Sequence, residues 1–137
     1  MRIMCVDNDQ TALQRIMKYC SELQEVTDVV GFTTEMEAMA WLRFHPCDIT
    51  FMETYKPGLN GLQLAANVRK LYPEVAVVFV TDEAFYARDA IRLRVTGYLL
   101  KPLSRARFKE EIEYVKSVMN GGNTLALKNQ QHILTIE

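Results

Sequence analysis

VAVVFV, at residues 75–80, is the strongest strand signal in this 137-residue chain and sets the expected fold class. All six residues are apolar and most are β-branched, as a strand buried on both faces of a sheet requires. Four more short apolar runs predict strands at residues 2–6, 26–32, 49–52 and 98–100. Apolar residues at helical spacing predict helices within residues 13–23, 34–46, 60–73, 86–93 and 104–119.

The predicted strands and helices alternate along the chain. Thr34 with Glu37 forms a capping box, and Asn60 and Ser104 are further candidate helix caps. Five strands that alternate with five helices predict an α/β protein, a three-layer sandwich around a five-stranded parallel sheet. Right-handed crossovers then bring the carboxyl ends of all strands to one edge of the sheet.

The composition excludes several classes of protein. Sixteen basic and seventeen acidic residues leave a formal charge of −1, so the net charge does not indicate binding to nucleic acid or to a membrane surface. No apolar run reaches the roughly 20 residues of a membrane helix and no signal peptide is visible, so we expect a cytoplasmic protein. The three cysteines and two histidines are scattered without metal-ligand spacing, which predicts neither a zinc site nor a disulfide framework.

Polar residues follow most of the predicted strands. In parallel α/β sheets, ligands bind beyond the carboxyl ends of the strands. Because these ends share one edge of the sheet, we expect a polar cluster there. Its members are Asp7, Asn8 and Asp9 after the first strand, Glu53 after the third, Thr81 and Asp82 after the fourth, and Lys101 after the fifth.

These residues, in this order, resemble the receiver domain of two-component response regulators. The likeness covers about residues 1–120 and is carried by CVDND at 5–9, DITFME at 48–53, Pro57-Gly58, Asn60-Gly61, Thr81 and YLLKP at 98–102. It implies a flavodoxin-like receiver fold with strand order 2-1-3-4-5, as in the chemotaxis receiver. Residues 81–87 and 98–102 look most like the branch whose regulators carry LytTR-type DNA-binding output domains.

The resemblance implies a phosphorylation site. In the family, acidic residues after the first and third strands hold Mg²⁺, and the aspartate after the third strand accepts a phosphoryl group from a histidine kinase. Thr81 and Lys101 would bind the phosphoryl oxygens, and Tyr98 occupies the position of the switch aromatic residue. The positions that correspond to metal ligands are Asp7, Asn8, Glu53 and the backbone carbonyl of Tyr55.

The phosphoacceptor position departs from the family pattern. It holds Glu53, whose side chain is one methylene longer than that of aspartate and extends its carboxylate about 1.5 Å further into the pocket. At this length the carboxylate is expected to reach Thr81 and Lys101 directly. We therefore interpret Glu53 as a built-in mimic of phospho-aspartate.

The second acidic position departs as well. Asn8 replaces an anionic metal ligand by a neutral one, so the sequence predicts at most weak Mg²⁺ binding. Asp9 and Asp82 are candidates for restoring a negative charge in this acidic pocket. An acidic residue at the start of a helix is, however, the more ordinary role for Asp9.

The sequence favours a non-enzymatic receiver domain that signals by protein contact through a degenerate phosphorylation site. One alternative is a working receiver that is phosphorylated on Glu53 and controls a DNA-binding output domain. Another is a flavodoxin-like cofactor binder, which is disfavoured because the loop after the first strand has carboxylates where a phosphate-binding loop needs Ser, Thr or Gly. The expected partners are a histidine kinase or another signalling protein, and a C-terminal output domain absent from this chain.

Half of the basic residues lie between residues 88 and 116. They are Arg88, Arg92, Arg94, Lys101, Arg105, Arg107, Lys109 and Lys116. In similar receivers the fourth helix, fifth strand and fifth helix mediate dimerisation or contact the output domain. Glutamates interleave with these basic residues, so a homodimer or output interface and an ordinary solvated surface both stay open. Direct nucleic-acid binding is disfavoured because no aromatic or Gly-rich motif accompanies the charges.

Residues 121–137 are expected to lie outside the receiver domain. The sequence NGGN at 120–123 predicts a helix stop and a linker. Strand-like runs at 124–128 and 132–137 predict a β-hairpin, either as an addition to the receiver or as the start of a truncated output domain.

Overall fold

All five predicted strands form one parallel sheet. The computed structural model describes residues 1–121 and 126–135. The strands are β1 (Arg2–Val6), β2 (Asp28–Phe32), β3 (Ile49–Met52), β6 (Ala76–Thr81) and β7 (Gly97–Leu100). Their order in the sheet is β2-β1-β3-β6-β7, which is the predicted order 2-1-3-4-5 when these strands are counted along the chain.

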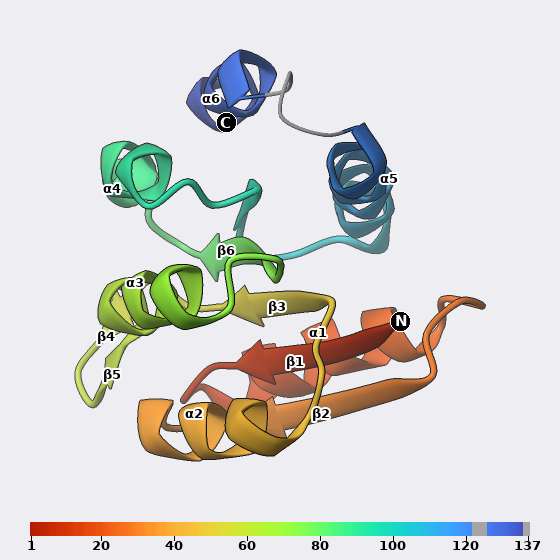
Figure 1. The fold of residues 1–137 in the computed structure, drawn as a ribbon, viewed down its shortest axis with the longest axis vertical. Helices are drawn as coiled ribbons and strands as arrows, with labels where there is room; N and C mark the ends of the chain where they lie inside the picture. The colour runs from red at the N-terminus through yellow and green to blue at the C-terminus, as the bar shows by residue number, and fades with distance from the viewer. Residues whose placement is uncertain (122–125, 136–137) are drawn as a thin grey trace.

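Helices cover both faces of this sheet (Figure 1). On one face pack α1 (Gln10–Ser21) and α5 (Arg105–Gly121). On the other face pack α2 (Glu35–Phe44), α3 (Gly61–Leu71) and α4 (Ala87–Arg92). Among the described residues, no helix combines the length and apolar character needed to span a bilayer.

The predicted caps are present at three helix starts. The Thr34 hydroxyl accepts a hydrogen bond from the backbone N–H of Glu37 at 3.2 Å. In the same way, the Asn60 side chain accepts from the Gln63 N–H at 3.0 Å. The Ser104 hydroxyl accepts from the Arg107 N–H at 3.1 Å. Each bond satisfies a backbone donor that the first turn of a helix leaves without a partner.

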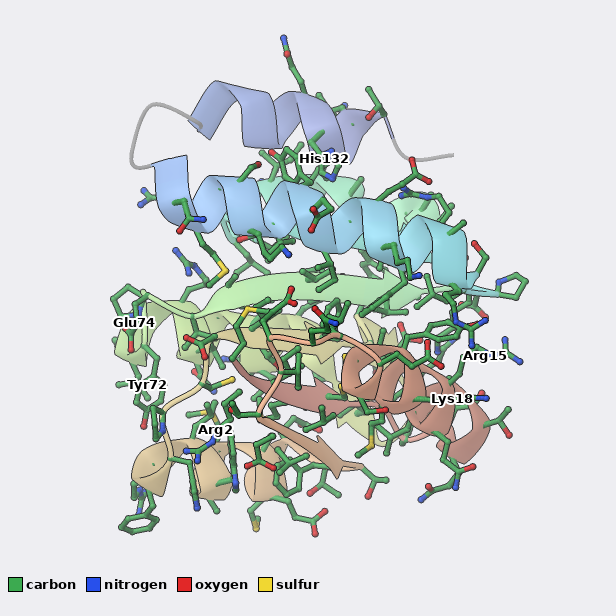
Figure 2. All side chains as sticks on the ribbon, turned by 90° about the vertical axis from the view of Figure 1, so that its right-hand side faces the viewer. Arg2, Arg15, Lys18, Tyr72, Glu74 and His132 are labelled. Atoms are coloured by element: carbon green, nitrogen blue, oxygen red, sulfur yellow. The ribbon has the colours of Figure 1, made fainter. Side chains whose placement is uncertain are left out.

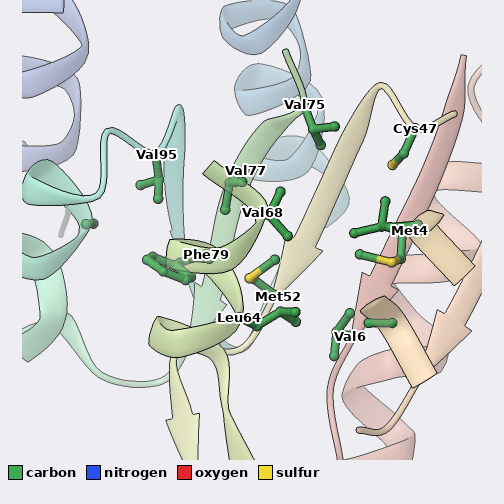
Figure 3. Close-up of a cluster of buried hydrophobic side chains, with 14 of the residues drawn as sticks. Met4, Val6, Cys47, Met52, Leu64, Val68, Val75, Val77, Phe79 and Val95 are labelled. Carbon is green, nitrogen blue, oxygen red and sulfur yellow. The ribbon is translucent and has the colours of Figure 1, made fainter. Parts of the chain in front are cut away.

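β6 runs through the middle of the core, which explains its uniformly apolar sequence. Val77 and Phe79 point toward the face covered by α2, α3 and α4, and Val78 and Val80 point toward α1 and α5. Figure 3 shows the first of these clusters, in which Leu64 and other α3 side chains lie against β6. A strand whose two faces are both buried requires apolar residues at every position.

Three local features differ from the sequence expectations. β2 begins at Asp28 rather than at Val26, because the Val26 N–H donates to the carbonyl of Leu23 in the turn that follows α1. A short hairpin of β4 (Tyr55–Lys56) and β5 (Leu59–Asn60) encloses the predicted Pro57-Gly58 turn. A single 3₁₀ turn, η1 (Ala84–Tyr86), precedes α4.

The β-hairpin predicted within residues 121–137 is wrong for the part that the structure describes. Residues Ala126–Leu134 form a helix, α6. Its sequence, ALKNQQHIL, is rich in good helix formers and has Ile133 as its single β-branched residue. Ile133 is buried against the rest of the chain, so tertiary packing adds to this preference. The linker residues 122–125 and the end of the second expected strand, 136–137, lie outside the described residues.

Candidate functional site

Four of the predicted polar residues meet at the carboxyl edge of the sheet. Asp7 follows β1, Glu53 follows β3, Thr81 ends β6 and Lys101 follows β7. These four strands are consecutive neighbours in the sheet, so their ends lie side by side. Asp7, Glu53 and Thr81 are buried, and only 16% of the Lys101 side chain is exposed.

The Lys101 ammonium bridges the two buried carboxylates. Its Nζ donates to Asp7 Oδ2 at 2.8 Å and to Glu53 Oε1 at 2.9 Å, so the Glu53–Lys101 contact expected from the sequence is present. The Lys101–Pro102 peptide bond that follows is cis. One ammonium for two carboxylates leaves this buried cluster with a formal charge of −1.

The pKa values in the cluster reflect burial opposed by pairing. Burial raises the pKa of Asp7 above its usual range, and the hydrogen bond from Lys101 only partly offsets this effect. Burial alone would lower the pKa of Lys101, but its hydrogen bonds to Asp7 and Glu53 outweigh burial and raise the pKa. Lys101 therefore stays charged at neutral pH, as the bridge requires.

The second oxygen of Glu53 is bound by Thr54, a residue to which the sequence analysis gave no role. Glu53 Oε2 accepts from the Thr54 backbone N–H at 2.7 Å and from the Thr54 hydroxyl at 3.0 Å. The Thr54 and Thr81 hydroxyl oxygens are 3.1 Å apart. The expectation that Glu53 reaches Thr81 directly is therefore wrong, because Thr54 lies between them.

Hydroxyl chemistry gives this chain of contacts a direction. Each hydroxyl has one proton, so the Thr54 hydroxyl cannot donate to both Glu53 and Thr81. If it donates to Glu53, its contact with Thr81 is a hydrogen bond in which the Thr54 oxygen accepts from the Thr81 hydroxyl. The Thr81 oxygen in turn accepts from the backbone N–H of Glu83 at 3.3 Å. The carbonyl of the same Glu83 accepts from the Tyr98 hydroxyl at 2.5 Å. These hydrogen bonds, linked through the Glu83 backbone, thus join the Glu53 carboxylate to the Tyr98 hydroxyl.

Tyr98 faces the core rather than solvent. Its side chain is 1% exposed, and its ring packs edge-on against Phe79 with the ring centroids 6.0 Å apart. Burial raises the pKa of its hydroxyl, which keeps that group a hydrogen-bond donor. The residue at the switch position is therefore held in an inward arrangement.

Gly61, the second residue of the Asn60-Gly61 pair, packs directly against the backbone of Glu53. A Cβ atom at Gly61 would lie 1.6 Å from the backbone carbonyl oxygen of Glu53, so no larger residue fits. The neighbouring Leu62 N–H donates to the Thr54 carbonyl at 2.9 Å. The start of α3 thereby fixes the backbone of Glu53 and of Thr54, which binds the Glu53 carboxylate.

The remaining predicted members of the acidic pocket have other partners. The Asn8 side chain donates to the carbonyl of Pro57 at 3.0 Å, next to the β4–β5 turn. Asp9 is the cap of α1, as its more ordinary role predicted, and Asp82 pairs with Lys56 at 2.8 Å. None of these bonds adds an anion to the Asp7–Glu53 pair.

A cavity of about 310 Å³ adjoins the cluster. Asp9 and Asp82 lie on its wall together with Lys56 and Lys101. Asp9 joins the site through its backbone N–H, which donates to Asp7 Oδ1 at 2.9 Å, whereas the carboxylates of Asp9 and Asp82 have other partners. The rest of the wall comes from α1, from Val80 of β6, and from Pro102 and Leu103, which follow Lys101. Of the four residues of the cluster, Lys101 is the one that lines this cavity.

The arrangement does not fit the metal that the receiver resemblance implies. Both oxygens of Asp7 and both oxygens of Glu53 already accept hydrogen bonds from the protein. The Lys101 ammonium lies between the two carboxylates, where it supplies the positive charge. Tyr55, whose carbonyl was the fourth expected ligand, begins β4 and pairs with Asn60. In residues 1–121 and 126–135, no group of three or more His, Cys, Asp or Glu side chains is placed to hold a metal ion.

The chain is similar to curated proteins that are named as transcriptional regulatory or sensory transduction proteins. The transcriptional regulatory protein LytR of Staphylococcus aureus (strain N315) is 24% identical over 131 residues, which cover 94% of this chain and 53% of the relative. The sensory transduction protein LytT of Oceanobacillus iheyensis is 23% identical over 124 residues, which cover 86% of this chain and 49% of the relative. The chain therefore spans about half the length of the curated relatives it matches.

Solved structures share the fold. The response regulatory domain of protein mrkE from Klebsiella pneumoniae superimposes with a TM-score of 0.79 at 22% identity, covering 88% of this chain and 98% of that one. The Salmonella typhimurium response regulator RcsB gives a TM-score of 0.77 at 15% identity, covering 98% of this chain and 68% of that one. At these identities the likeness shows the fold alone.

A family match covers most of the chain. Residues 3–113 match the response regulator receiver domain. This match favours the receiver interpretation over the flavodoxin-like cofactor binder, which shares the sheet topology. The chain belongs to the family of response regulator receiver domains and is the receiver domain of a two-component response regulator.

Proposed function

We propose that this receiver signals without phosphorylation, with Glu53 as a permanent substitute for phospho-aspartate. One observation carries the proposal: the two oxygens of Glu53 accept hydrogen bonds from Lys101 and from Thr54, which leads to Thr81. The resemblance assigns contacts with Lys101 and Thr81 to phosphoryl oxygens, and Glu53 makes the first of these directly and the second through Thr54. A side-chain carboxylate therefore occupies the role that the transferred group would have.

The same contacts disfavour phosphoryl transfer to Glu53. The cluster has a formal charge of −1 before any phosphoryl group arrives, so a further anion meets net repulsion in a buried place. The extra methylene of Glu53 also moves the nucleophile, and a misplacement of about 1 Å can cost on the order of 100-fold in rate. Mg²⁺, which would offset the repulsion, is expected to bind weakly because both carboxylates are already engaged.

The proposal extends to the rest of the regulator. We infer a non-enzymatic, cytoplasmic domain whose partners are a histidine kinase or another signalling protein and a C-terminal output domain. DNA binding by that output domain is proposed because LytR is named a transcriptional regulatory protein and because LytR and LytT are each about twice as long as this chain. Two copies would associate through the face formed by α4, β7 and α5.

Some of the basic residues of that face form ion pairs within the chain. Arg105 forms a two-bond pair with Glu22, and Lys116 pairs with Glu25 at 2.7 Å and with Glu113 at 2.8 Å. These ion pairs are partly exposed, and such pairs contribute little to stability. The charges therefore favour a solvated surface with local pairing, and contact specificity is expected from other groups.

The substitution Glu53→Gln tests the proposed function. It keeps the size of the side chain and removes its charge, so Lys101 and Thr54 lose their anionic partner. Lys101 follows β7 directly and the other contacts of Glu53 lead on to the Tyr98 hydroxyl, so we expect β7 to open locally more often. The Tyr98 backbone amide, which donates to Glu111, should then exchange its hydrogen roughly 5- to 150-fold faster, the range of a coupling of about 1–3 kcal/mol. Amide exchange measured by NMR gives this ratio directly.

Asp82→Asn is the matched control for Glu53→Gln. It removes the same charge close to the same cavity, but from the exposed pair with Lys56. We expect Tyr98 exchange in this variant to stay within twofold of the wild type, as for other surface changes. Equal Tyr98 exchange in Glu53→Gln and Asp82→Asn would refute the role of Glu53.

A further inference from the structure

β7 is an edge strand, and its outer side is covered by groups from other elements. It pairs with β6 on one side only. On its open side, the Tyr98 backbone N–H donates to Glu111 Oε2 of α5 at 3.0 Å instead of to a further strand. A side-chain carboxylate thus satisfies a donor that an uncovered sheet edge would offer to another chain.

Glu111 is placed for this task by the residues around it. It is 1% exposed although it is ionisable, so it needs specific partners. A Cβ atom at Gly97 would lie 2.3 Å from Glu111 Oε2, so glycine at the start of β7 makes room for the carboxylate. Its other oxygen, Oε1, is 3.9 Å from an Arg107 nitrogen of the same helix.

The closest partner of that second oxygen comes from α6. His132 Nε2 lies 2.8 Å from Glu111 Oε1, and the His132 ring stacks on Tyr114 with centroids 3.6 Å apart and planes at 11°. Figure 2 shows His132 between α6 and α5. The next residue, Ile133, is 1% exposed and belongs to the same buried cluster as Tyr98. Two adjacent residues thus anchor α6, one by a polar contact and one by an apolar contact.

α6 lies over β7 between α4 and α5 (Figure 1). We propose that the α4–β7–α5 face is a helix-docking surface whose resident occupant is the chain's own α6. A partner, including a second copy, then gains this face only by displacing α6. This inference goes beyond the proposed function and does not depend on the role of Glu53.

The length and sequence of α6 indicate that it can undock from the α4–β7–α5 face. It has nine residues, fewer than the roughly 12–15 that an isolated helix needs to be even marginally stable in water. Among the α6 side chains that the structure describes, Gln130, Gln131 and Leu134 are exposed, and the contact with the domain comes from His132 and Ile133. α6 therefore stays helical only while His132 and Ile133 are docked, and folding of this segment is coupled to occupation of the face.

The full chain with Ile133→Asp tests the cover. A carboxylate in the apolar anchor position costs enough to undock the helix, and local opening accelerates amide exchange. We expect amides of α4 and β7 to exchange roughly tenfold faster or more, as measured by hydrogen exchange with mass spectrometry. Leu134→Asp is the matched control, because it introduces the same charge at the neighbouring, exposed position and leaves exchange of α4 and β7 unchanged.

A second pair of variants separates undocking from general loss of stability. His132→Ala removes the contacts with Glu111 and Tyr114 without burying a charge, and Gln131→Ala is its exposed control. We expect faster exchange of α4 and β7 in His132→Ala, with β1 and β3 as protected as in the wild type. If exchange of α4 and β7 is unchanged in both Ile133→Asp and His132→Ala, α6 does not cover this face and the inference is overturned. A failure of the Glu53→Gln test would leave this result standing.

Discussion

Lys101→Met is expected to lower the free energy of unfolding at pH 7 by about 3–5 kcal/mol, because it leaves a buried ionic group without its counter-ion. Lys101 is the only cation within hydrogen-bonding distance of Asp7 and Glu53 among the described residues. Both carboxylates would remain buried and would face each other without compensation. Urea denaturation of the two proteins measures the difference.

The loss in Lys101→Met should depend on pH with a defined sign. Burial raises the folded-state pKa of Asp7 above 3.8, and removing Lys101 takes away the main opposing contact. Between the unfolded value and this raised pKa, the folded state binds more protons, so stability rises as the pH falls. The deficit of Lys101→Met is therefore expected to shrink on acidification from pH 7 through the raised pKa of Asp7.

Lys56→Met is the matched control for this prediction. It removes a lysine of the same length from the exposed pair with Asp82, whose side chains are 34% and 60% exposed. Pairs of this kind contribute about 0–1 kcal/mol. Similar losses in Lys56→Met and Lys101→Met would show that the buried cluster does not need its ammonium.

Rebuilding the acidic pair is the second change with a large expected effect. The double variant Asn8→Asp with Glu53→Asp restores the anion after β1 and shortens the side chain at the acceptor position. We expect it to accept a phosphoryl group from a small-molecule donor in the presence of Mg²⁺ at least about 100-fold faster than the wild type, since the nucleophile returns to its in-line position. Mg²⁺ affinity should also rise, because anionic oxygen is the preferred ligand.

The single variants show which departure limits the reaction. Glu53→Asp alone corrects the position of the nucleophile but keeps the neutral Asn8, so we expect an intermediate rate. Asn8→Asp alone keeps the long side chain and should strengthen Mg²⁺ binding with little gain in rate. If the double variant is as slow as the wild type, the occupied hydrogen bonds of the cluster, rather than Glu53 and Asn8, prevent the reaction.

The fold was largely predictable because its signals are local. A run such as residues 75–80 is apolar at every position only when both faces of a strand are covered, and the structure has β6 inside the sheet, between β3 and β7, with every residue buried. Helix caps such as Thr34 and Asn60 are likewise encoded within four residues. Short apolar runs outside the sheet were less informative, since the segment that contains Ile133 forms a helix rather than a strand.

The sequence was sufficient to predict which residues at the strand ends form the site, but not all of their contacts. Topology alone brings Asp7, Glu53 and Lys101 together, because the ends of neighbouring parallel strands must meet. Thr54 was missed because the sequence does not specify where the side chain of a polar residue in the loop after a strand points. Its signal was present only as a second hydroxyl-bearing residue beside the acceptor position. Only the side-chain geometry shows that it separates Glu53 from Thr81.

The contacts of α6 were beyond sequence reasoning for a different reason. Glu111 and His132 are 21 positions apart and belong to no shared motif. Glu111 looked like one of several glutamates on a charged helix, and His132 like an isolated histidine. Their pairing follows from the packing of α6 against α4, β7 and α5, which local preferences do not specify.

The central claim, signalling without phosphorylation, is tested by exposing the wild-type chain to excess small-molecule phosphodonor with Mg²⁺ and recording its intact mass. The account predicts that the mass stays unchanged under conditions in which the rebuilt Asn8→Asp with Glu53→Asp variant gains one phosphoryl group. A wild-type chain that gains one phosphoryl group, mapped by fragmentation to Glu53, would contradict the account and establish a working phosphoacceptor.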